Sequence, residues 1–314
     1  KIFSVLNDVP LNTLDKRNNN QIIKNLGFVI NKSNLSLGYG NWNQWWGPGI
    51  HNSLVMTNNS QGFYNYFLEL ESYDKNSNFN FLIKYSVSEK MKNYLGLYYY
   101  LSSINYKIRY KNFEFGLSKN ILSGGNMNIK WGLSDASKII FTNENIRYWD
   151  QIVDLYFLYS IENIGLKAFV EIGQPNRSYN DKNPSDYSNQ SRGSNIGIRK
   201  IGVFNNSNLI FGAEYARLVQ GVYYNIIPTP NWYDNIKYNY NSYIGRRWAA
   251  HSGADSDDFL IYFGFMDKNN SIIYEMNYER HGVTYHFPPE VKFESRISFT
   301  HKYKNLFINF LYEN

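Results

Sequence analysis

The sequence predicts an all-β protein, a transmembrane antiparallel β-barrel of the bacterial outer membrane with about 14–18 strands. Three observations support this fold class. Segments of about 8–10 residues alternate apolar with polar side chains, close to the length that a tilted membrane strand needs. The 314-residue chain is rich in Tyr (29) and Phe (21), which favour strands and membrane interfaces. Its connections are either short or long, as the two ends of an outer-membrane barrel require.

The alternation recurs along most of the chain. It covers residues 64–71, 81–88, 113–118, 166–172, 209–215, 272–279, 294–300 and 305–312. Between 272 and 279, for example, Ile272, Tyr274 and Met276 alternate with Glu275 and Asn277. Successive strand residues point to opposite faces, so each predicted strand has one apolar and one polar face. A soluble sandwich would bury the apolar face, whereas in the predicted barrel this face contacts lipid and the polar face lines the lumen.

The predicted organisation is a leader or periplasmic segment at 1–20 and a barrel at 21–314, with an inserted Trp-rich loop at 40–62. The short polar connections are 31–34, 205–208 and 267–270, and the long ones are 174–194, 218–241 and 281–290. The sequence begins at Lys1 without a charged-then-apolar signal pattern. We therefore expect an exported chain whose signal peptide has been removed.

Composition excludes several classes of protein. The net charge of +6 is spread along the chain rather than gathered into basic runs, which argues against nucleic-acid binding. The chain has no cysteine, so it has neither disulfides nor thiolate metal sites. The mean hydropathy is −0.49, and no apolar run reaches the roughly 18 residues of a transmembrane helix. The sequence lacks a phosphate-binding P-loop motif, and we expect no cofactor.

The Trp-rich loop is the first candidate site. A Gly-Pro-Gly turn at 47–49 prevents a helix or a central strand from continuing through it. Its candidate ligands are Trp42, Trp45, Trp46, His51, Asn58 and Asn59. Flat aromatic faces beside amide edges suit the binding of a sugar ring. The alternative is a structural plug whose tryptophans pack against other side chains.

A second candidate site lies in a loop before a late strand. Its candidate ligands are Arg246, Arg247, His251, Asp255 and Asp257. Two carboxylates could serve as the acid and base of a glycoside hydrolase, and His251 with the aspartates could bind a metal. No ligand spacing supports either possibility. We expect instead that the arginines pair with the aspartates in the lumen or donate hydrogen bonds to an anionic ligand.

Arg192 completes the candidate ligand set. It could form an ion pair with Glu171 inside a barrel, or simply fill a polar lumen. His281, His286 and His301 have no recognisable partners in the sequence, and we expect them at the rim or in loops. The chain also lacks a Ser-His-Asp signature in a strand–turn–helix context, so we predict that it is not an enzyme and holds no metal.

A resemblance to a known family follows from three motifs. Residues 45–49 (Trp-Trp-Gly-Pro-Gly) and 53–59 (Ser-Leu-Val-Met-Thr-Asn-Asn) resemble the signature of the Wzi-like capsule assembly family. Further matches, in the order of that family, are Glu171, 191–193 (Ser-Arg-Gly), 197–200 (Gly-Ile-Arg-Lys) and the segment 245–257 with its Gly-Arg, His-Ser-Gly and Asp. The resemblance covers residues 35–314.

The resemblance implies an outer-membrane barrel of about 18 strands with a periplasmic helical bundle near its N-terminus. It implies a lectin, not an enzyme, that holds exported capsular polysaccharide at the cell surface; relatives in gliding Bacteroidetes are associated with motility. The chain departs from the family in two places. Residues 1–20 are short for a helical bundle, and Gly-Phe-Tyr at 62–64 replaces Pro-Phe-Pro, which bears on the polysaccharide recognised. The Asn-, Ile- and Lys-rich composition is typical of an AT-rich Bacteroidetes genome.

The sequence therefore predicts an outer-membrane β-barrel, surrounded by outer-membrane lipid, that binds or anchors surface (capsular) polysaccharide. The alternative is a porin-like channel, or an accessory barrel of a secretion or gliding machinery whose tryptophans plug the lumen and contact envelope export or gliding proteins. A third hypothesis is an enzyme that acts on envelope glycan or lipid through residues 255–258.

Overall fold

The computed structural model describes residues 25–314 apart from short gaps. The gaps are 73, 75–76, 94, 126–130, 142–148, 176–191, 202–207, 220–221, 224–226, 229–231, 234, 244–245, 284–287 and 304–305. The expected leader or periplasmic segment at 1–20, most of the long connection at 174–194, most of the short connection at 205–208, and His286 lie outside the described residues.

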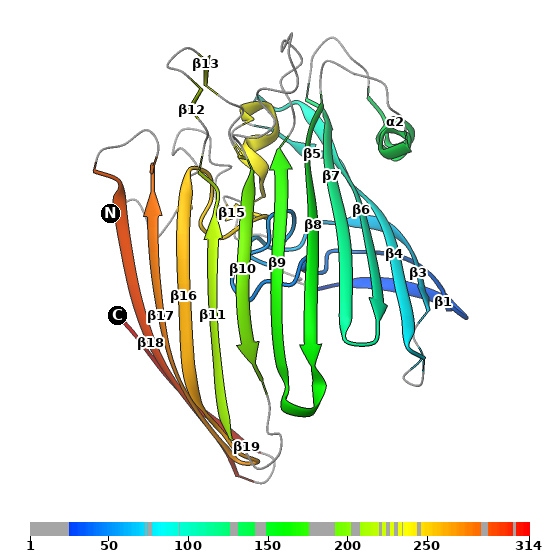
Figure 1. Cartoon of the computed structure of the whole chain (residues 1–314). Helices are drawn as coiled ribbons and strands as arrows, with labels where there is room; N and C mark the ends of the chain where they lie inside the picture. The colour runs from blue at the N-terminus through cyan, green and yellow to red at the C-terminus, as the bar shows by residue number, and fades with distance from the viewer. Residues whose placement is uncertain are drawn as a thin grey trace.

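One antiparallel sheet of 15 strands curves around a lumen (Figure 1). In order of pairing its strands are β1 (Gly27–Lys32), β2 (Leu35–Gly40), β3 (Asn65–Ser72), β4 (Phe79–Ser88), β6 (Tyr98–Tyr110), β7 (Phe113–Gly124), β8 (Trp149–Ile161), β9 (Leu166–Pro175), β10 (Gly193–Lys200), β11 (Leu209–Arg217), β16 (Ser256–Met266), β17 (Asn270–His281), β18 (Glu290–Tyr303) and β19 (Leu306–Glu313). The short strand β5 (Met91–Lys92) pairs with β6 outside this order. Neighbours in the sheet follow one another along the chain, which is the up-and-down order of outer-membrane barrels.

The predicted strands are confirmed. Six of the eight alternating segments fall within β4, β7, β9, β11, β17 and β18. Segment 64–71 begins one residue before β3, and residues 306–312 of the last segment fall within β19. The 15 strands lie within the predicted number. Alternation is less clean in β6, where Tyr99, Tyr100 and Leu101 are all buried. The outer face of β6 is covered here by the short helix α2 (Leu133–Lys138), since Tyr100 packs with Ala136.

The two faces of the sheet differ in polarity. On β8, Leu155 and Phe157 are 43% and 42% exposed, whereas the alternate residues Asp154 and Tyr156 are each 1% exposed. Large exposed apolar residues recur on the other strands, among them Leu68, Ile108, Phe115, Ile172, Ile196, Phe259, Phe263, Phe293 and Phe310. The apolar face therefore points outward, as lipid-facing strands require, and the polar face points into the lumen. A soluble sandwich would show the opposite arrangement.

Four glycines of the barrel wall lie directly across the sheet from an aromatic residue. The registered pairs are Gly38–Phe67, Gly116–Tyr156, Gly197–Phe169 and Gly212–Tyr262. A Cβ atom on Gly116 would come within 2.1 Å of the Tyr156 ring, and one on Gly212 within 2.4 Å of Tyr262. Each ring therefore lies over the backbone of its glycine, which fixes the register of the two strands.

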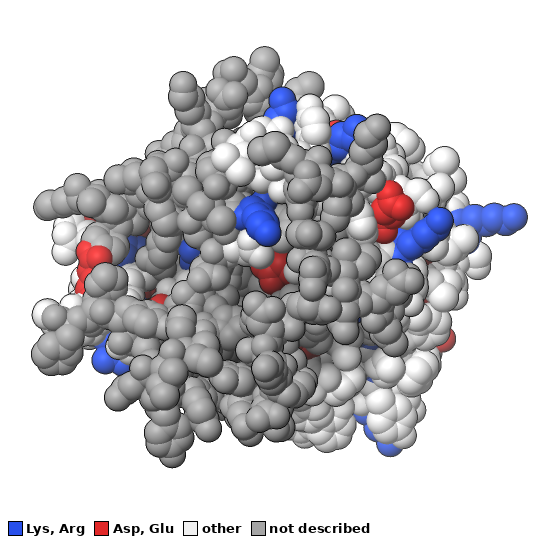
Figure 2. Space-filling view, turned by 90° about the horizontal axis from the view of Figure 1, so that it is seen from above, with Lys and Arg blue, Asp and Glu red and all other residues white. Residues whose placement is uncertain are grey.

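The strand ends that border the long connections lie at one end of the sheet, and the described short turns lie at the other (Figure 1). The long end carries the smaller elements α2, η2 (Ile139–Phe141), β12 (Val222–Tyr223), β13 (Ile227–Pro228), η4 (Ile236–Asn241), β14 (Ser242–Tyr243) and β15 (Arg246–Arg247), while η3 (Glu162–Ile164) forms a turn at the short end. Seen from the long end, the described acidic and basic side chains are interspersed (Figure 2). Among the described residues, no helix is both long and apolar enough to cross a membrane.

The main hydrophobic cluster of the protein fills part of the lumen. Its members come from the segment between β2 and β3, from the segment between β11 and β16, and from the wall: Trp46, Leu54, Val55, Met56, Phe63, Met91, Tyr99, Leu101, Leu122, Ile152, Leu218, Trp232, Tyr233, Tyr238, Trp248, Ala249 and Ala250. The rings of Phe63 and Trp248 meet edge to face with centroids 5.9 Å apart. Two segments far apart in the sequence thus pack together inside the barrel.

Candidate functional site

The segment between β2 and β3, residues 41–64, runs through the lumen, and we call it the plug. A carboxylate of the wall holds its centre. Glu214 on β11 accepts hydrogen bonds from the backbone N–H groups of Ile50, His51 and Asn52. The distance from the backbone nitrogen of Asn52 to Glu214 Oε1 is 2.6 Å. A carboxylate that accepts from three consecutive amides fixes the backbone as well as its own position.

A second wall carboxylate holds the next part of the plug. Glu171 on β9 is fully buried, and its Oε1 accepts hydrogen bonds from Ser53 Oγ at 3.1 Å and from the backbone N–H of Leu54 at 2.9 Å. Beside it, Asn195 Nδ2 on β10 donates to the backbone oxygen of Asn52 at 2.9 Å. Three neighbouring strands therefore contribute one side chain each to the same few plug residues.

The plug is also tied to the loop that precedes β16. The side chain of Asn52 donates from Nδ2 to Asp258 Oδ2 at 2.7 Å, and its Oδ1 accepts from the backbone N–H of His251 at 2.8 Å. Farther along, the backbone N–H of Thr57 donates to the backbone oxygen of Trp248 at 2.6 Å. The two candidate segments of the sequence are thus joined in space.

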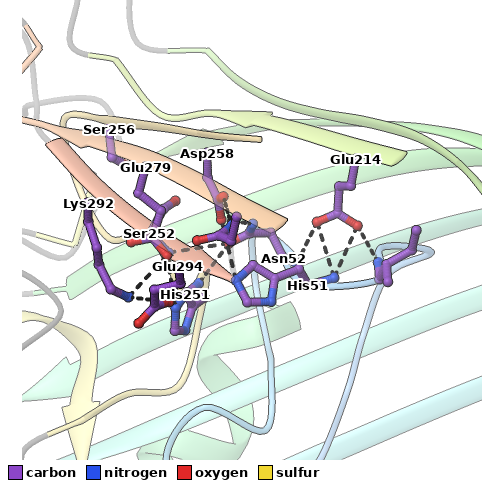
Figure 3. A network of polar contacts seen from close by, with 12 residues as sticks. His51, Asn52, Glu214, His251, Ser252, Ser256, Asp258, Glu279, Lys292 and Glu294 are labelled. Carbon is purple, nitrogen blue, oxygen red and sulfur yellow. Dashed lines mark hydrogen bonds and ion pairs between the residues drawn. The ribbon is translucent and has the colours of Figure 1, made fainter. Parts of the chain in front are cut away.

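A cluster of histidines and charged groups lies where these segments meet the wall (Figure 3). The rings of His51 and His251 are 4.3 Å apart, and His251 Nε2 is 3.2 Å from Glu279 Oε1 on β17. Lys292 Nζ on β18 lies 3.4 Å from the same oxygen. Burial and the neighbouring His251 lower the pKa of His51 to about 3, so its imidazole is neutral at physiological pH.

Two hollows adjoin the plug. The first, of about 500 Å³, is lined by Trp45, Gly47, Gly49, Ile50, His51, Thr57, Asn58, Asn59, Arg199 and His251. The second, of about 600 Å³, has among its lining residues Trp42, Trp45, Phe67, Lys84 and Lys107. The half-buried indole of Trp45 lines both. Each hollow has the volume of a small-ligand site and combines an aromatic face with hydrogen-bonding groups.

Five of the twelve predicted ligand residues meet around the first hollow. Trp45, His51, Asn58, Asn59 and His251 line it together. Two other predicted tryptophans have different surroundings. Trp42 lines the second hollow and meets Phe67 edge to face, with centroids 5.8 Å apart. Trp46 is 6% exposed and belongs to the hydrophobic cluster, so the plug interpretation holds for Trp46.

The predicted pairing of Arg246 and Arg247 with the aspartates does not extend to Asp257, whose partner is Arg280. Asp257 and Asp258 belong to β16 itself rather than to a loop, so their side chains point to opposite faces. Asp258 faces Asn52 in the lumen, whereas Asp257 accepts from Arg280 Nε at 2.8 Å on the other face of the sheet. Asp257 is therefore removed from the first hollow.

The remaining candidates are dispersed. The Arg247 guanidinium is buried and lies 5.5 Å from the centre of the Tyr233 ring, and Asp255 is buried with a φ of 47°. Arg246 is exposed and lines a further hollow beside His251. Arg192 is exposed at the long end, whereas Glu171, its suggested partner, accepts hydrogen bonds from the plug; the pairing of these two is not observed in the described contacts.

Several residues of the site were not identified in the sequence. Glu214, Asn52, Arg199 and Glu279 anchor the plug or line the hollows, yet each stands in an ordinary alternating or polar context. The sequence could have pointed to them in two ways: some lie on the polar face of a predicted strand, and Asn52 lies in the Trp-rich loop. His281, expected at the rim, is instead buried, with Nε2 3.0 Å from Glu279 Oε2.

A comparison with solved structures finds a barrel of the same shape. It is Wzi of Escherichia coli, described as an outer-membrane protein involved in group 1 capsule assembly and as a carbohydrate-binding β-barrel. The TM-score is 0.65 at 12% sequence identity, over 91% of this chain and 65% of Wzi. The chain has the fold of Wzi.

The likeness to Wzi confirms the predicted fold class and the resemblance that the plug motif carries. This chain spans less than two thirds of the length of Wzi, at 65%. No family model and no curated protein matches the sequence.

Proposed function

We propose that this chain is a non-catalytic outer-membrane β-barrel that binds or anchors exported surface polysaccharide, with capsular polysaccharide as the favoured class. The observation that carries the proposal is the first hollow, where the indole of Trp45 stands beside the amides of Asn58 and Asn59 and the guanidinium of Arg199. An apolar ring face with amide and guanidinium donors around it matches the apolar face and hydroxyl edge of a sugar.

The outer face supports the location. Exposure of its leucine, isoleucine and phenylalanine side chains to water would be unfavourable, whereas contact with lipid suits them. The likeness to Wzi, which is an outer-membrane and carbohydrate-binding barrel, supports the same location and the same class of ligand.

The absence of catalysis is part of the proposal. The enzyme hypothesis placed Asp255 with Asp257 or Asp258 across one scissile bond. Asp257 is paired with Arg280 and Asp258 with Asn52 on opposite faces of β16. Asp257 therefore faces away from the lumen, which argues against the pair of Asp255 with Asp257 and supports a non-catalytic role.

Binding to purified polysaccharide tests the proposal. Isothermal titration of the detergent-solubilised barrel with capsular polysaccharide of the source strain should show saturable binding. Trp45→Ala should weaken it about 30-fold, since an aromatic hot spot contributes about 2 kcal/mol or more. Trp149→Ala is the matched control, because Trp149 lies near the Lys119 ammonium, 5.8 Å away, and does not line either hollow.

A folded barrel that binds no glycan would contradict the proposal. It would favour the alternative of a channel or of an accessory barrel in secretion or gliding, with a protein partner at the long end. Capture of one envelope protein by the solubilised barrel, in an equimolar ratio, would then support that alternative.

A further inference from the structure

Two histidines and a carboxylate from three separate segments converge in the lumen. His51 belongs to the plug, His251 to the loop before β16, and Glu279 to β17 (Figure 3). One nitrogen or oxygen from each side chain lies within 4.8 Å of the other two. These residues are 200 and 28 positions apart in the sequence, so no local spacing reveals the cluster.

The separations are close to those of a metal site. Around tetrahedral Zn²⁺, bonds of about 2.0–2.2 Å place neighbouring ligand atoms roughly 3.3 Å apart. His251 Nε2 and Glu279 Oε1 are already 3.2 Å apart. The His51 ring lies beside that of His251, with centroids 4.3 Å apart and the planes tilted by 57°, and one ligand atom of each of the three residues lies within 4.8 Å of the other two.

One nitrogen of the cluster has no hydrogen bond to any residue that the structure describes. This atom is the buried His51 Nε2, and the carboxylate oxygen Asp258 Oδ2 lies 3.6 Å from it. A buried polar atom of this kind costs free energy unless something satisfies it. A cation held between His51 and its neighbours would do so.

The cluster lies among further charged groups. Asp258 and Glu294 add two carboxylates, while Lys292 adds one ammonium, 3.4 Å from Glu279 Oε1 and 2.8 Å from Glu294 Oε2. The second oxygen of Glu279 contacts His281 Nε2 at 3.0 Å, the kind of outer contact that orients a ligating carboxylate.

We propose that His51, His251 and Glu279 bind one Zn²⁺, which fastens the plug to β17 and to the loop before β16. Two imidazoles with one carboxylate suit Zn²⁺, whereas Ca²⁺ and Mg²⁺ prefer ligand sets made of oxygen. The fourth position of the ion belongs to water, because His51 and His251 also line the hollows. The inference is independent of the proposed polysaccharide binding.

Metal titration of the whole chain tests this site. The barrel is purified in detergent, treated with a chelator, and titrated with Zn²⁺, with Ca²⁺ in parallel; bound zinc is counted by elemental analysis. One Zn²⁺ per chain is expected, with weak or no binding of Ca²⁺. His51→Gln and His251→Gln should each weaken Zn²⁺ binding by roughly 100-fold or more, since even outer contacts are worth about 10–100-fold.

The control is His301→Gln, which alters a half-buried histidine outside the cluster whose Nδ1 lies 2.7 Å from Asn270 Oδ1. It should bind Zn²⁺ as the unchanged chain does. Co²⁺ substitution gives a second readout, because tetrahedral coordination produces intense visible absorption that the His51 and His251 variants should lose. A heat-modifiable band on gels shows that each variant is folded.

Two results would overturn the proposal. One is a folded, unchanged barrel that binds no stoichiometric Zn²⁺, which would make the cluster an ion-pair network centred on Glu279. The other is Zn²⁺ binding that persists unchanged in both His51→Gln and His251→Gln, which would place the metal elsewhere.

Discussion

Oε1 of Glu214 on β11 lies 2.6 Å from the backbone nitrogen of Asn52, 162 residues earlier in the chain. Through this contact a side chain of the barrel wall holds the backbone of the plug in place. The plug bends sharply at Pro48 and exposes consecutive N–H groups, and the wall offers an inward carboxylate at the matching height. The hollows beside Trp45 keep their form because the plug backbone is held in this way.

Replacing the anchoring carboxylate should loosen the plug. Glu214→Gln keeps one acceptor oxygen but turns an NH₂ group toward backbone donors, so we expect a loss of about 1–3 kcal/mol in the free energy of unfolding. The measurement is urea-dependent unfolding in lipid vesicles. The control Glu275→Gln removes a partly exposed contact to Arg296 at 2.7 Å and should cost no more than about 1 kcal/mol. Equal costs for the two variants would refute the anchoring role of Glu214.

The plug tryptophans should differ in their effect on stability. Trp46 is packed in the hydrophobic cluster, so Trp46→Ala should lower the unfolding free energy by about 3–5 kcal/mol. Trp45 is half-buried and lines hollows, so Trp45→Ala should cost much less in the same unfolding experiment. A larger cost for Trp45→Ala than for Trp46→Ala would reverse the assigned roles.

The contact between Gly116 and Tyr156 should be intolerant of added volume. A Cβ on Gly116 would meet the Tyr156 ring, whose hydroxyl is held by Glu114 Oε1 at 2.9 Å. Gly116→Val should therefore destabilise the barrel by about 1–3 kcal/mol. Gly132→Ala is the control, because its Cβ would meet only Asp135 Oδ2, at 3.5 Å. The test is the unfolding midpoint in denaturant, and an unchanged midpoint for Gly116→Val would count against the close packing.

The outer face should behave as a lipid-facing surface. Phe157 is exposed near the middle of β8, so Phe157→Lys should cost about 2–4 kcal/mol in a bilayer, whereas Phe157→Leu should cost little. The two variants are compared by folding into vesicles. If lysine and leucine were tolerated equally, the outward apolar face would not be a membrane surface.

The fold was predictable because a barrel repeats one local rule. Apolar–polar alternation with period two identified eight of the strands, and the direction of the apolar face followed from their length and from the placement of tyrosines. Strands whose outer face is covered, such as β6 beneath Ala136, show less alternation and were not traced.

The site was predictable only in part. The composition of the Trp-rich loop, with Trp45, Asn58 and Asn59, identified it as a candidate site, and these three residues line one hollow. Glu214 and Glu279 did not, because their importance depends on which plug atoms lie opposite them across the lumen. Asp257 was placed in a loop, whereas it belongs to the first residues of β16. In a strand, neighbouring side chains point to opposite faces, so Asp257 faces away from the lumen that Asp258 faces.

The central claim is that the hollow beside Trp45 binds surface polysaccharide, and a glycan array tests it most directly. The detergent-solubilised barrel is applied to an array that includes the capsular polysaccharide and lipopolysaccharide of the source strain, beside the Trp45→Ala and Trp149→Ala variants. We predict binding that free sugar competes away, that Trp149→Ala retains, and that Trp45→Ala loses. Folded barrel that binds no glycan, or binding that Trp45→Ala leaves unchanged, would contradict the account.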